Sequence, residues 1–258
     1  MQIYFKLSFI GSSDIMNISM EKLNIGAKKL GIHLSPRQLE QFHTYYQELL
    51  DWNKRVNLTS ITGYEDVQIK HFLDSLTVIL AWQKPIIDAD LRLIDVGAGA
   101  GIPGIPLKIT FPNLRLALLE ATAKKAAFLH HIQNKLQLDN VEIVVGRAEE
   151  VAHLSQYRER FDIVLSRAVA PLPTLVELTL PFCAIGGSLI AQKKGVIDPE
   201  ISKATKAINI LGGSLREVKR IDLAEFTDKR CLIVIDKASP TPHQYPRRPG
   251  IPSKRPLV

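Results

Sequence analysis

The chain has 258 residues, of which 33 are Lys or Arg and 26 are Asp or Glu, and its formal net charge is +7. This length suits one domain with a substantial core plus an extension, and the basic balance favours a polyanionic partner. Two cysteines within apolar runs, Cys183 and Cys231, exclude a disulfide scaffold and indicate a cytoplasmic protein, and no apolar run approaches the roughly 18 residues of a membrane helix. Residues 1–20 lack the features of a signal peptide, and we expect a disordered or misassigned start.

Residues 21–85 are predicted to form a helical extension. In SPRQLEQFHTYYQELLDWN, Ser35 has the position of an N-cap, Pro36 is the first helical residue, and apolar side chains recur at helical spacing. After the polar turn NKRVNLTSITGYED, the segment VQIKHFLDSLTVILAW has the pattern of a second helix.

From residue 86 to 238, short apolar runs alternate with helical patterns, which predicts an α/β core. These runs lack strict alternation, as expected of parallel strands covered on both faces. The fold class we expect is therefore α/β, with a Rossmann-like, mostly parallel sheet and helices on both faces. The predicted strands are LRLIDV, LRLALLE, VEIVVG, FDIVLS, GGSLIAQ and RCLIVID. Residues 239–258 are rich in proline and basic side chains, which excludes an ordinary helix or central strand and on composition alone predicts a disordered tail.

The stretch LIDVGAGAGIPGIPL joins the first strand to a helix, as in a nucleotide-binding loop. Gly97, Gly99 and Gly101 let the main chain approach a ligand closely. A dinucleotide would place its pyrophosphate at the helix N-terminus, but Asp95 beside the loop would repel it. The same carboxylate attracts the positively charged methionine end of S-adenosylmethionine, so we favour this methyl donor over NAD.

Further candidate residues follow the next three strands. Glu120 ends the second strand, where a carboxylate can accept hydrogen bonds from ribose hydroxyls, although a solvated strand end is the alternative. Thr122 is predicted to cap the next helix. Glu149, next to Ala148, suits either an adenine ring or the dipole of a helix N-terminus. Arg167 reaches the carboxyl edge of the sheet, where it suits a carboxylate, a phosphate, an RNA base or an internal ion pair.

These motifs resemble the bacterial 16S rRNA guanine-N7 methyltransferases, the RsmG or GidB family. The segment NLTSITGYEDVQIKHFLDSL looks like the helical signature of the family, LIDVGAGAGIPGIPL like its methyl-donor loop, and LSRAVAPL like the segment after its fourth strand. The likeness runs from about Leu34 to the end of the chain. One departure is LLEATAKK, where the family has LxES or LxDS, so Glu120 matches the family pattern more directly than Ala121 and Thr122 do.

The resemblance implies a donor pocket and an RNA surface. The cofactor-binding residues it implies or supports are Asp95, Gly97, Gly99, Gly101, Ile102, Glu120, Ala121, Thr122, Ala148, Glu149 and Arg167. The tail 239–258 and the QKKG stretch also look like family features, so we expect the tail to dock on the core. The RNA-binding residues expected are Lys193, Lys194, Arg247, Arg248 and Lys254.

Methylation of guanine N7 needs no general base, because N7 carries an exposed lone pair. We therefore expect direct in-line transfer that depends on positioning, with Arg167 as a positioning residue and no catalytic acid or base. His71 and Asp74 suit either the site or the fold. The adjacent His130 and His131 point apart on a helix, so no metal site is expected.

The expected partner is 16S rRNA or the small ribosomal subunit, acted on by a monomer without a membrane or metal. The core motifs also allow a methyltransferase of the same fold that acts on a protein or a small molecule. A noncatalytic module that binds an adenosyl ligand or RNA is a further alternative. An NAD-dependent dehydrogenase is disfavoured by Asp95 and by the lack of a hydride-transfer residue beside a second domain.

Overall fold

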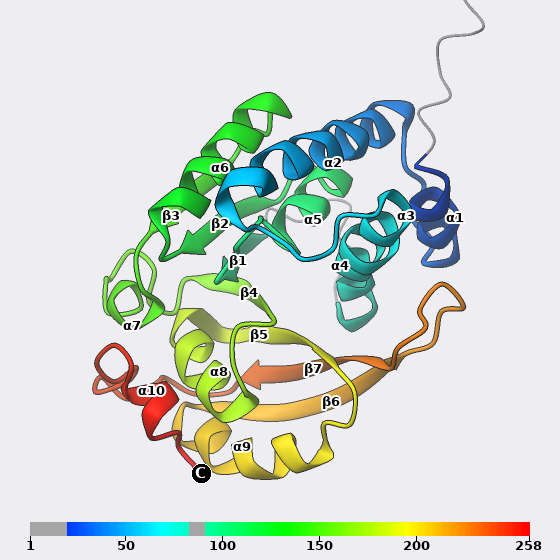
Figure 1. Ribbon diagram of the computed structural model, residues 1–258. Helices are drawn as coiled ribbons and strands as arrows, with labels where there is room; N and C mark the ends of the chain where they lie inside the picture. The colour runs from blue at the N-terminus through cyan, green and yellow to red at the C-terminus, as the bar shows by residue number, and fades with distance from the viewer. Residues whose placement is uncertain (1–19, 83–90) are drawn as a thin grey trace, which may run out of the picture.

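The computed structural model describes residues 20–82 and 91–258 and contains a seven-stranded sheet (Figure 1). The strand order is β3-β2-β1-β4-β5-β7-β6, and all neighbours are parallel except β7, which runs antiparallel to β5 and β6. The strands are β1 Arg92–Val96, β2 Arg115–Glu120, β3 Val141–Val145, β4 Phe161–Arg167, β5 Cys183–Lys194, β6 Gly213–Ile221 and β7 Arg230–Lys237. The expected α/β fold is confirmed. The prediction for the start of the chain lies outside the described residues, apart from Met20.

Helices cover both faces of the sheet because neighbouring residues of each strand point to opposite sides. Leu93 of β1 packs with Phe128 of α6 in one core, whereas Ile94 packs with Leu175 of α8 in the other. The first face carries the N-terminal helices with α5 Gly104–Thr110 and α6 Ala123–Lys135. The second carries α7 Ala148–Val151, α8 Leu172–Thr179, the short η3 Leu180–Phe182 and α9 Asp198–Ile210.

The strand β6 was not among the predicted strands. Its sequence, GSLREVKRI, is polar and charged, since it lies at the edge of the sheet and is only partly buried. Charged side chains on an edge strand prevent pairing with other chains. They also remove the apolar run by which the other six strands were identified.

The N-terminal extension contains α1 Glu21–Lys29 and α2 Pro36–Val56. As predicted, Ser35 caps α2, and its side chain and that of Gln38 form a reciprocal capping box. The predicted second helix changes pitch along its length, as α3 Tyr64–Val67, the π-helix η1 Gln68–Leu73, α4 Asp74–Leu76 and the 3-10 helix η2 Thr77–Ala81. A π-helical turn is rare and often marks a functional site.

The C-terminal tail lies against the second face of the sheet (Figure 1). Arg158 donates hydrogen bonds to the carbonyls of Thr241, Pro242 and Tyr245. The one-turn helix α10 Ile251–Lys254 forms despite the prolines, because Pro252 occupies the first turn, where no backbone donor is needed. The expectation that the tail excludes an ordinary helix therefore fails at this single turn.

Candidate functional site

The glycine loop between β1 and α5 has three glycines with positive φ, and they face different surroundings. A Cβ at Gly99 (φ 59°) would meet only the carbonyl oxygen of Gly97, at 3.8 Å. A Cβ at Gly97 would lie 2.6 Å from Val169, and one at Gly101 would lie 2.4 Å from Ile105 in the core. Only Gly99 of the three therefore leaves open space, whereas Gly101 permits helix packing and Gly97 permits the segment after β4 to approach the loop.

Asp95 is fully buried at the end of β1. Its Oδ2 accepts a hydrogen bond from the Gly104 amide at 2.9 Å, which ties the strand to the start of α5. Its Oδ1 is buried without a hydrogen-bond partner. Burial raises the pKa of Asp95 to about 7, against a lowering by the Gly104 amide and by the positive charge of Arg167. Such an orphaned acceptor suits a donor group supplied by a ligand.

Glu120 is buried at the end of β2, so the sequence prediction of a solvated strand end does not apply. Its Oε2 accepts from the Gly99 amide at 2.9 Å and its Oε1 from the Thr122 amide at 2.7 Å. A carboxylate has about four lone-pair sites, so both oxygens retain capacity for a ligand hydroxyl. Thr122 is at the N-cap position of α6, but its side chain makes no capping hydrogen bond. Ala121 is exposed.

Two other predicted donor-site positions have structural contacts of their own. Ile102 is 7% exposed and packs in the first core. Glu149, which follows Ala148 in the first turn of α7, accepts a hydrogen bond from the Gly250 amide at 3.1 Å. The carboxyl end of β3 is thus joined to the tail through Glu149.

Arg167, at the end of β4, belongs to a cluster of three charged side chains and a histidine from three segments. Its Nη1 lies 2.8 Å from Oδ2 of Asp74 and its Nη2 lies 2.8 Å from Nδ1 of His71. Arg230, 4% exposed at the start of β7, lies 2.6 Å from the other Asp74 oxygen. Asp74 therefore bridges two arginines and joins the helical extension to the carboxyl edge of the sheet. We call these four residues the Asp74 cluster.

His71 is buried, and its ring is enclosed by hydrogen-bond partners. Thr59 lies 2.7 Å from Nε2, while Arg167 and the Lys70 carbonyl lie near Nδ1. Burial and the adjacent Arg167 lower the pKa of His71 to about 3. The imidazole is consequently neutral at physiological pH, and its neutral form is the one that can accept the Arg167 hydrogen bond.

Three residues that were not among the predicted site residues hold this edge together. Tyr45 of α2 is fully buried and donates its hydroxyl to the Ala100 carbonyl of the glycine loop. Gln192 of β5 donates to the Asp74 carbonyl at 2.7 Å, and its Oε1 is buried without a partner. Arg230 completes the Asp74 cluster. The helical spacing of α2 was the one signal available for any of them, because Tyr45 lies three residues after the buried Phe42 and four before the buried Leu49.

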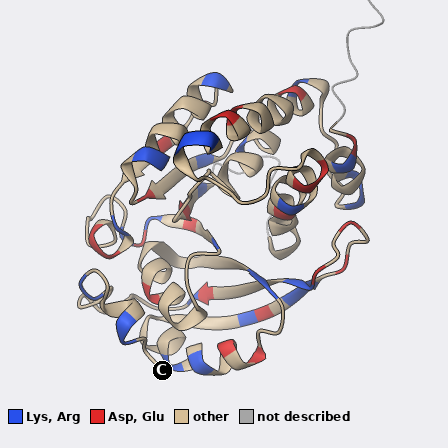
Figure 2. Ribbon diagram, viewed as in Figure 1, with Lys and Arg blue, Asp and Glu red and all other residues tan. Residues whose placement is uncertain are grey.

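The predicted RNA-binding side chains fall into two groups. Lys193 bonds the Ala170 carbonyl and Glu200, and Arg247 makes a bidentate pair with the fully buried Glu177. These two cations therefore hold the fold. Exposed cations are Lys194, which pairs with Asp228, and Arg248 and Lys254 of the tail. In Figure 2 the C-terminal tail around α10 carries several blue, basic positions.

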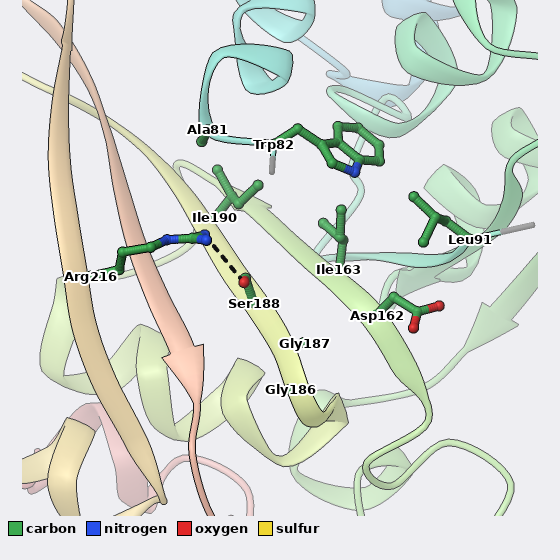
Figure 3. A pocket seen from close by; sticks show the side chains of 10 residues that line it. All are labelled: Ala81, Trp82, Leu91, Asp162, Ile163, Gly186, Gly187, Ser188, Ile190 and Arg216. Carbon is green, nitrogen blue, oxygen red and sulfur yellow. Dashed lines mark hydrogen bonds between the residues drawn. The ribbon is translucent and has the colours of Figure 1, made fainter. Parts of the chain in front are cut away.

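A cavity shown in Figure 3 lies toward the amino ends of the parallel strands, away from the glycine loop. It is lined by the start of β4 and β5, including Asp162 and Ser188, and Arg216 donates to the Ser188 hydroxyl at 3.2 Å. Ligands of open α/β sheets bind at the carboxyl ends of the strands. We therefore assign the candidate site to the glycine loop and the Asp74 cluster.

Neither a metal centre nor a membrane segment was found in residues 20–82 and 91–258. No group of three or more His, Cys, Asp or Glu side chains in these ranges is arranged to hold a metal ion. The helices described there are too short or too polar to span a bilayer.

Comparison with known proteins gives one consistent family. Residues 38–227 match the GidB family, described as rRNA small subunit methyltransferase G. A protein of Dehalococcoides mccartyi named ribosomal RNA small subunit methyltransferase G is 54% identical over 239 residues, which are 93% of this chain and 100% of that protein. A relative of the same name from Roseiflexus castenholzii is 48% identical over the same coverage. The crystal structure of the cyclase SpnF shares the fold, with a TM-score of 0.50 and 13% identity over 66% of this chain and 82% of that chain.

Proposed function

This chain belongs to the GidB family of rRNA small subunit methyltransferase G proteins, and we propose that it methylates N7 of a guanine in 16S rRNA. It is an S-adenosylmethionine-dependent rRNA methyltransferase with a Rossmann-like core. The observation that carries the assignment of the donor site is the buried, unpartnered Oδ1 of Asp95 beside the open face of Gly99.

The residues of the glycine loop fit this methyl donor. Asp95 offers a carboxylate oxygen for the ammonium group of the methionine end, which compensates for the cost of its burial. Gly99 leaves room for close approach of the ligand to the main chain, and Glu120 retains acceptor capacity for ribose hydroxyls. The bound donor supplies an electrophilic methyl carbon on a sulfonium.

Other residues of the donor pocket are assigned by position. Gly97 and Ile102 belong to the loop, Ala121 and Thr122 follow Glu120, and Ala148 with Glu149 follows β3. We propose that these residues, which follow the carboxyl ends of β1, β2 and β3, flank the ribose and adenine in that order. Gly101 belongs to the same loop, and packing also requires a glycine there, since a Cβ would meet Ile105.

Transfer to N7 requires alignment rather than proton removal. The N7 lone pair can attack the methyl carbon in line when the atoms are held roughly 3 to 3.5 Å apart. His71 is poorly suited to act as a base, because it is buried and already accepts a hydrogen bond from Arg167. We therefore propose that Arg167 positions the substrate, and that Asp74 and His71 orient Arg167.

The proposed partner is 16S rRNA, either free or within the small ribosomal subunit. Lys194, Arg248 and Lys254 present exposed charge suited to phosphates, whereas Lys193 and Arg247 would contribute through the surfaces they hold in place. We further propose a cytoplasmic monomer that needs no metal, with the tail 239–258 docked on the 86–238 core.

The experiment is transfer of labelled methyl groups to naked 16S rRNA, to small ribosomal subunits and to ribosomal proteins. We expect label in the RNA of at least one of the first two substrates. Label confined to protein would support the alternative protein methyltransferase, and donor binding without any transfer would support a noncatalytic module. The variant Gly99→Asp serves as the control without donor binding.

A further inference from the structure

A second cavity opens on the α9 side of the sheet, at the same edge as the glycine loop. It has a volume of about 390 Å³ and lies among the turn after β5, the end of β6 and the start of β7. Figure 1 shows two of the segments that contribute lining residues, the yellow turn before α9 and the orange hairpin between β6 and β7. This volume is within the range of roughly 300 to 1,000 Å³ that is typical of ligand sites. We call it the β6–β7 pocket.

The walls and the rim of the β6–β7 pocket differ in chemistry. Val196, Val218 and Cys231 give it apolar walls, and Val196 is 76% exposed at its mouth. Arg220 and Lys229 are exposed cations on the lining, and neither forms an ion pair within the part of the chain that the structure describes. An apolar wall beside unpaired cations suits a ligand with a flat ring and a phosphate.

Two carboxylates also line the pocket, Asp198 and Asp222. They would repel a bare phosphate, but a carboxylate can accept hydrogen bonds from the amino group of a nucleobase. The combination of ring-sized apolar space, cations and carboxylates therefore matches a nucleotide better than an inorganic anion.

The strand register connects this pocket to the candidate site. Lys193 of β5 pairs with Cys231 of β7, and Cys231 pairs with Arg220 of β6. Neighbouring strands lie about 4.8 Å apart, so Arg220 lies roughly 10 Å along the sheet from Lys193. Lys193 in turn contacts the Ala170 carbonyl, three residues after Arg167. The distance from Arg167 to the β6–β7 pocket therefore suits a second nucleotide of an RNA strand whose guanine lies at Arg167.

We propose that the β6–β7 pocket binds a nucleotide of the rRNA strand close to the methylated guanine. Its base enters the apolar space, and its phosphate contacts Arg220 and Lys229. The inference rests on the proposed function and adds a second subsite to it. Single-stranded RNA is commonly recognised by bases held outside a helix in this way.

The test compares two double variants that each remove two cations. Arg220→Ala with Lys229→Ala changes the β6–β7 pocket, and Arg37→Ala with Lys54→Ala changes α2, on the opposite face. We expect the pocket variant to bind rRNA about tenfold more weakly. The slope of log affinity against log salt concentration should become shallower by about 0.7 for each phosphate that is no longer neutralised. The affinity of the pocket variant for S-adenosylhomocysteine and its turnover at saturating RNA should match those of the wild type. The α2 variant should match the wild type in rRNA affinity, salt dependence, S-adenosylhomocysteine affinity and turnover.

A photo-crosslinking residue at position 196 locates the bound nucleotide. We expect crosslinks within a few nucleotides of the methylated guanine. If the wild type methylates rRNA but the pocket variant binds RNA normally, or the crosslinks lie elsewhere, the pocket proposal is wrong and the proposed function stands. If the wild type transfers no methyl group to RNA, the proposed function itself fails.

Discussion

The glycine loop and the Asp74 cluster meet at the same edge of the sheet but are built in different ways. The loop is one continuous stretch, in which Asp95 accepts a hydrogen bond from an amide nine residues later. Glu120, at the end of the next strand, accepts from the Gly99 amide, 21 residues before it. In the cluster, Asp74 joins Arg167, 93 residues away, and its carbonyl accepts from Gln192, 118 residues away. A local motif thus shapes the proposed donor side, whereas tertiary structure shapes the proposed acceptor side.

This difference has an energetic consequence. Besides the carboxylates of Asp95 and Glu120, the loop is held by backbone hydrogen bonds, such as those from the Gly97 and Ala98 amides to the Leu119 carbonyl, and each contributes modestly to stability. The cluster instead buries charges, so the loss of one partner leaves other charges unpaired. Substitutions in the loop should therefore affect donor binding, whereas substitutions in the cluster should affect folding and the placement of Arg167.

The largest effect is expected for Asp74→Ala, because it leaves Arg167 and Arg230 without their shared carboxylate. Removal of one partner of a buried ion pair costs about 3 to 5 kcal/mol, which urea denaturation would measure. Asp66→Ala in α3 is the matched control, since Asp66 is half exposed and pairs with Lys70 at the surface; it should cost less than about 1 kcal/mol. Equal losses in the two variants would contradict the role of the cluster.

In the loop, Gly99→Asp should weaken binding of S-adenosylhomocysteine by at least about 100-fold, because a charged side chain would occupy the open space. Calorimetry would measure the affinity. The control is Gly186→Asp, which also has positive φ and no atom within 4 Å of a Cβ, but lies at the other edge of the sheet. Unchanged affinity in the Gly99 variant would show that the donor binds elsewhere.

Donor affinity should also depend on the charge of Asp95. Because burial raises the pKa of Asp95 to about 7, the ionised fraction rises about tenfold between pH 6 and pH 8. We expect donor affinity to rise by a similar factor over that range, and Asp95→Asn to bind weakly and to lose this rise. If the donor affinity of the wild type did not change between pH 6 and pH 8, the contact between Asp95 and the ammonium group would be contradicted.

The stability of the free protein should change with pH in the opposite direction. Unfolded Asp95 releases its proton near pH 3.8, whereas the folded chain keeps it up to about pH 7. Between these values the folded state binds more protons, so this residue lowers the free energy of unfolding as the pH rises. Denaturation of the wild type and of Asp95→Asn at pH 4, 5.5 and 7 would isolate its contribution.

The smallest effects are expected next to the cluster, where Lys193 and Lys194 can be compared directly. Lys194 is half exposed, so Lys194→Ala should weaken rRNA binding only two- to threefold and change stability by less than about 1 kcal/mol. Lys193→Ala removes the largely buried partner of Glu200 and should lower stability more than it lowers RNA affinity. If Lys193→Ala instead lowered RNA affinity more than stability, Lys193 would contact RNA directly.

The sequence was sufficient to predict features that depend on local patterns. Six strands, the capped start of α2 and the glycine loop were all identified from apolar runs, spacing and turn residues. The edge strand β6 was missed because its charges conceal the strand pattern. The change of pitch at Gln68–Leu73 was missed because its apolar spacing fits an ordinary helix.

The arrangement of the site was predictable only in part. The positions of Asp95 and Glu120 beside the glycine loop were predicted because they follow directly from the strand and the loop. Arg230, in contrast, is separated from Asp74 by more than half of the chain, and no pattern near either residue links the two. The same limit applies to Arg247, whose pairing with the buried Glu177 could not be distinguished from RNA binding by its charge alone.

The most direct test is mass-spectrometric mapping of 16S rRNA after incubation with the purified protein and S-adenosylmethionine. The proposed function predicts one added methyl group, at N7 of a single guanine, and none with the Gly99→Asp variant. A methyl group on another atom or base, or unmodified rRNA both as naked RNA and within small subunits, would contradict it.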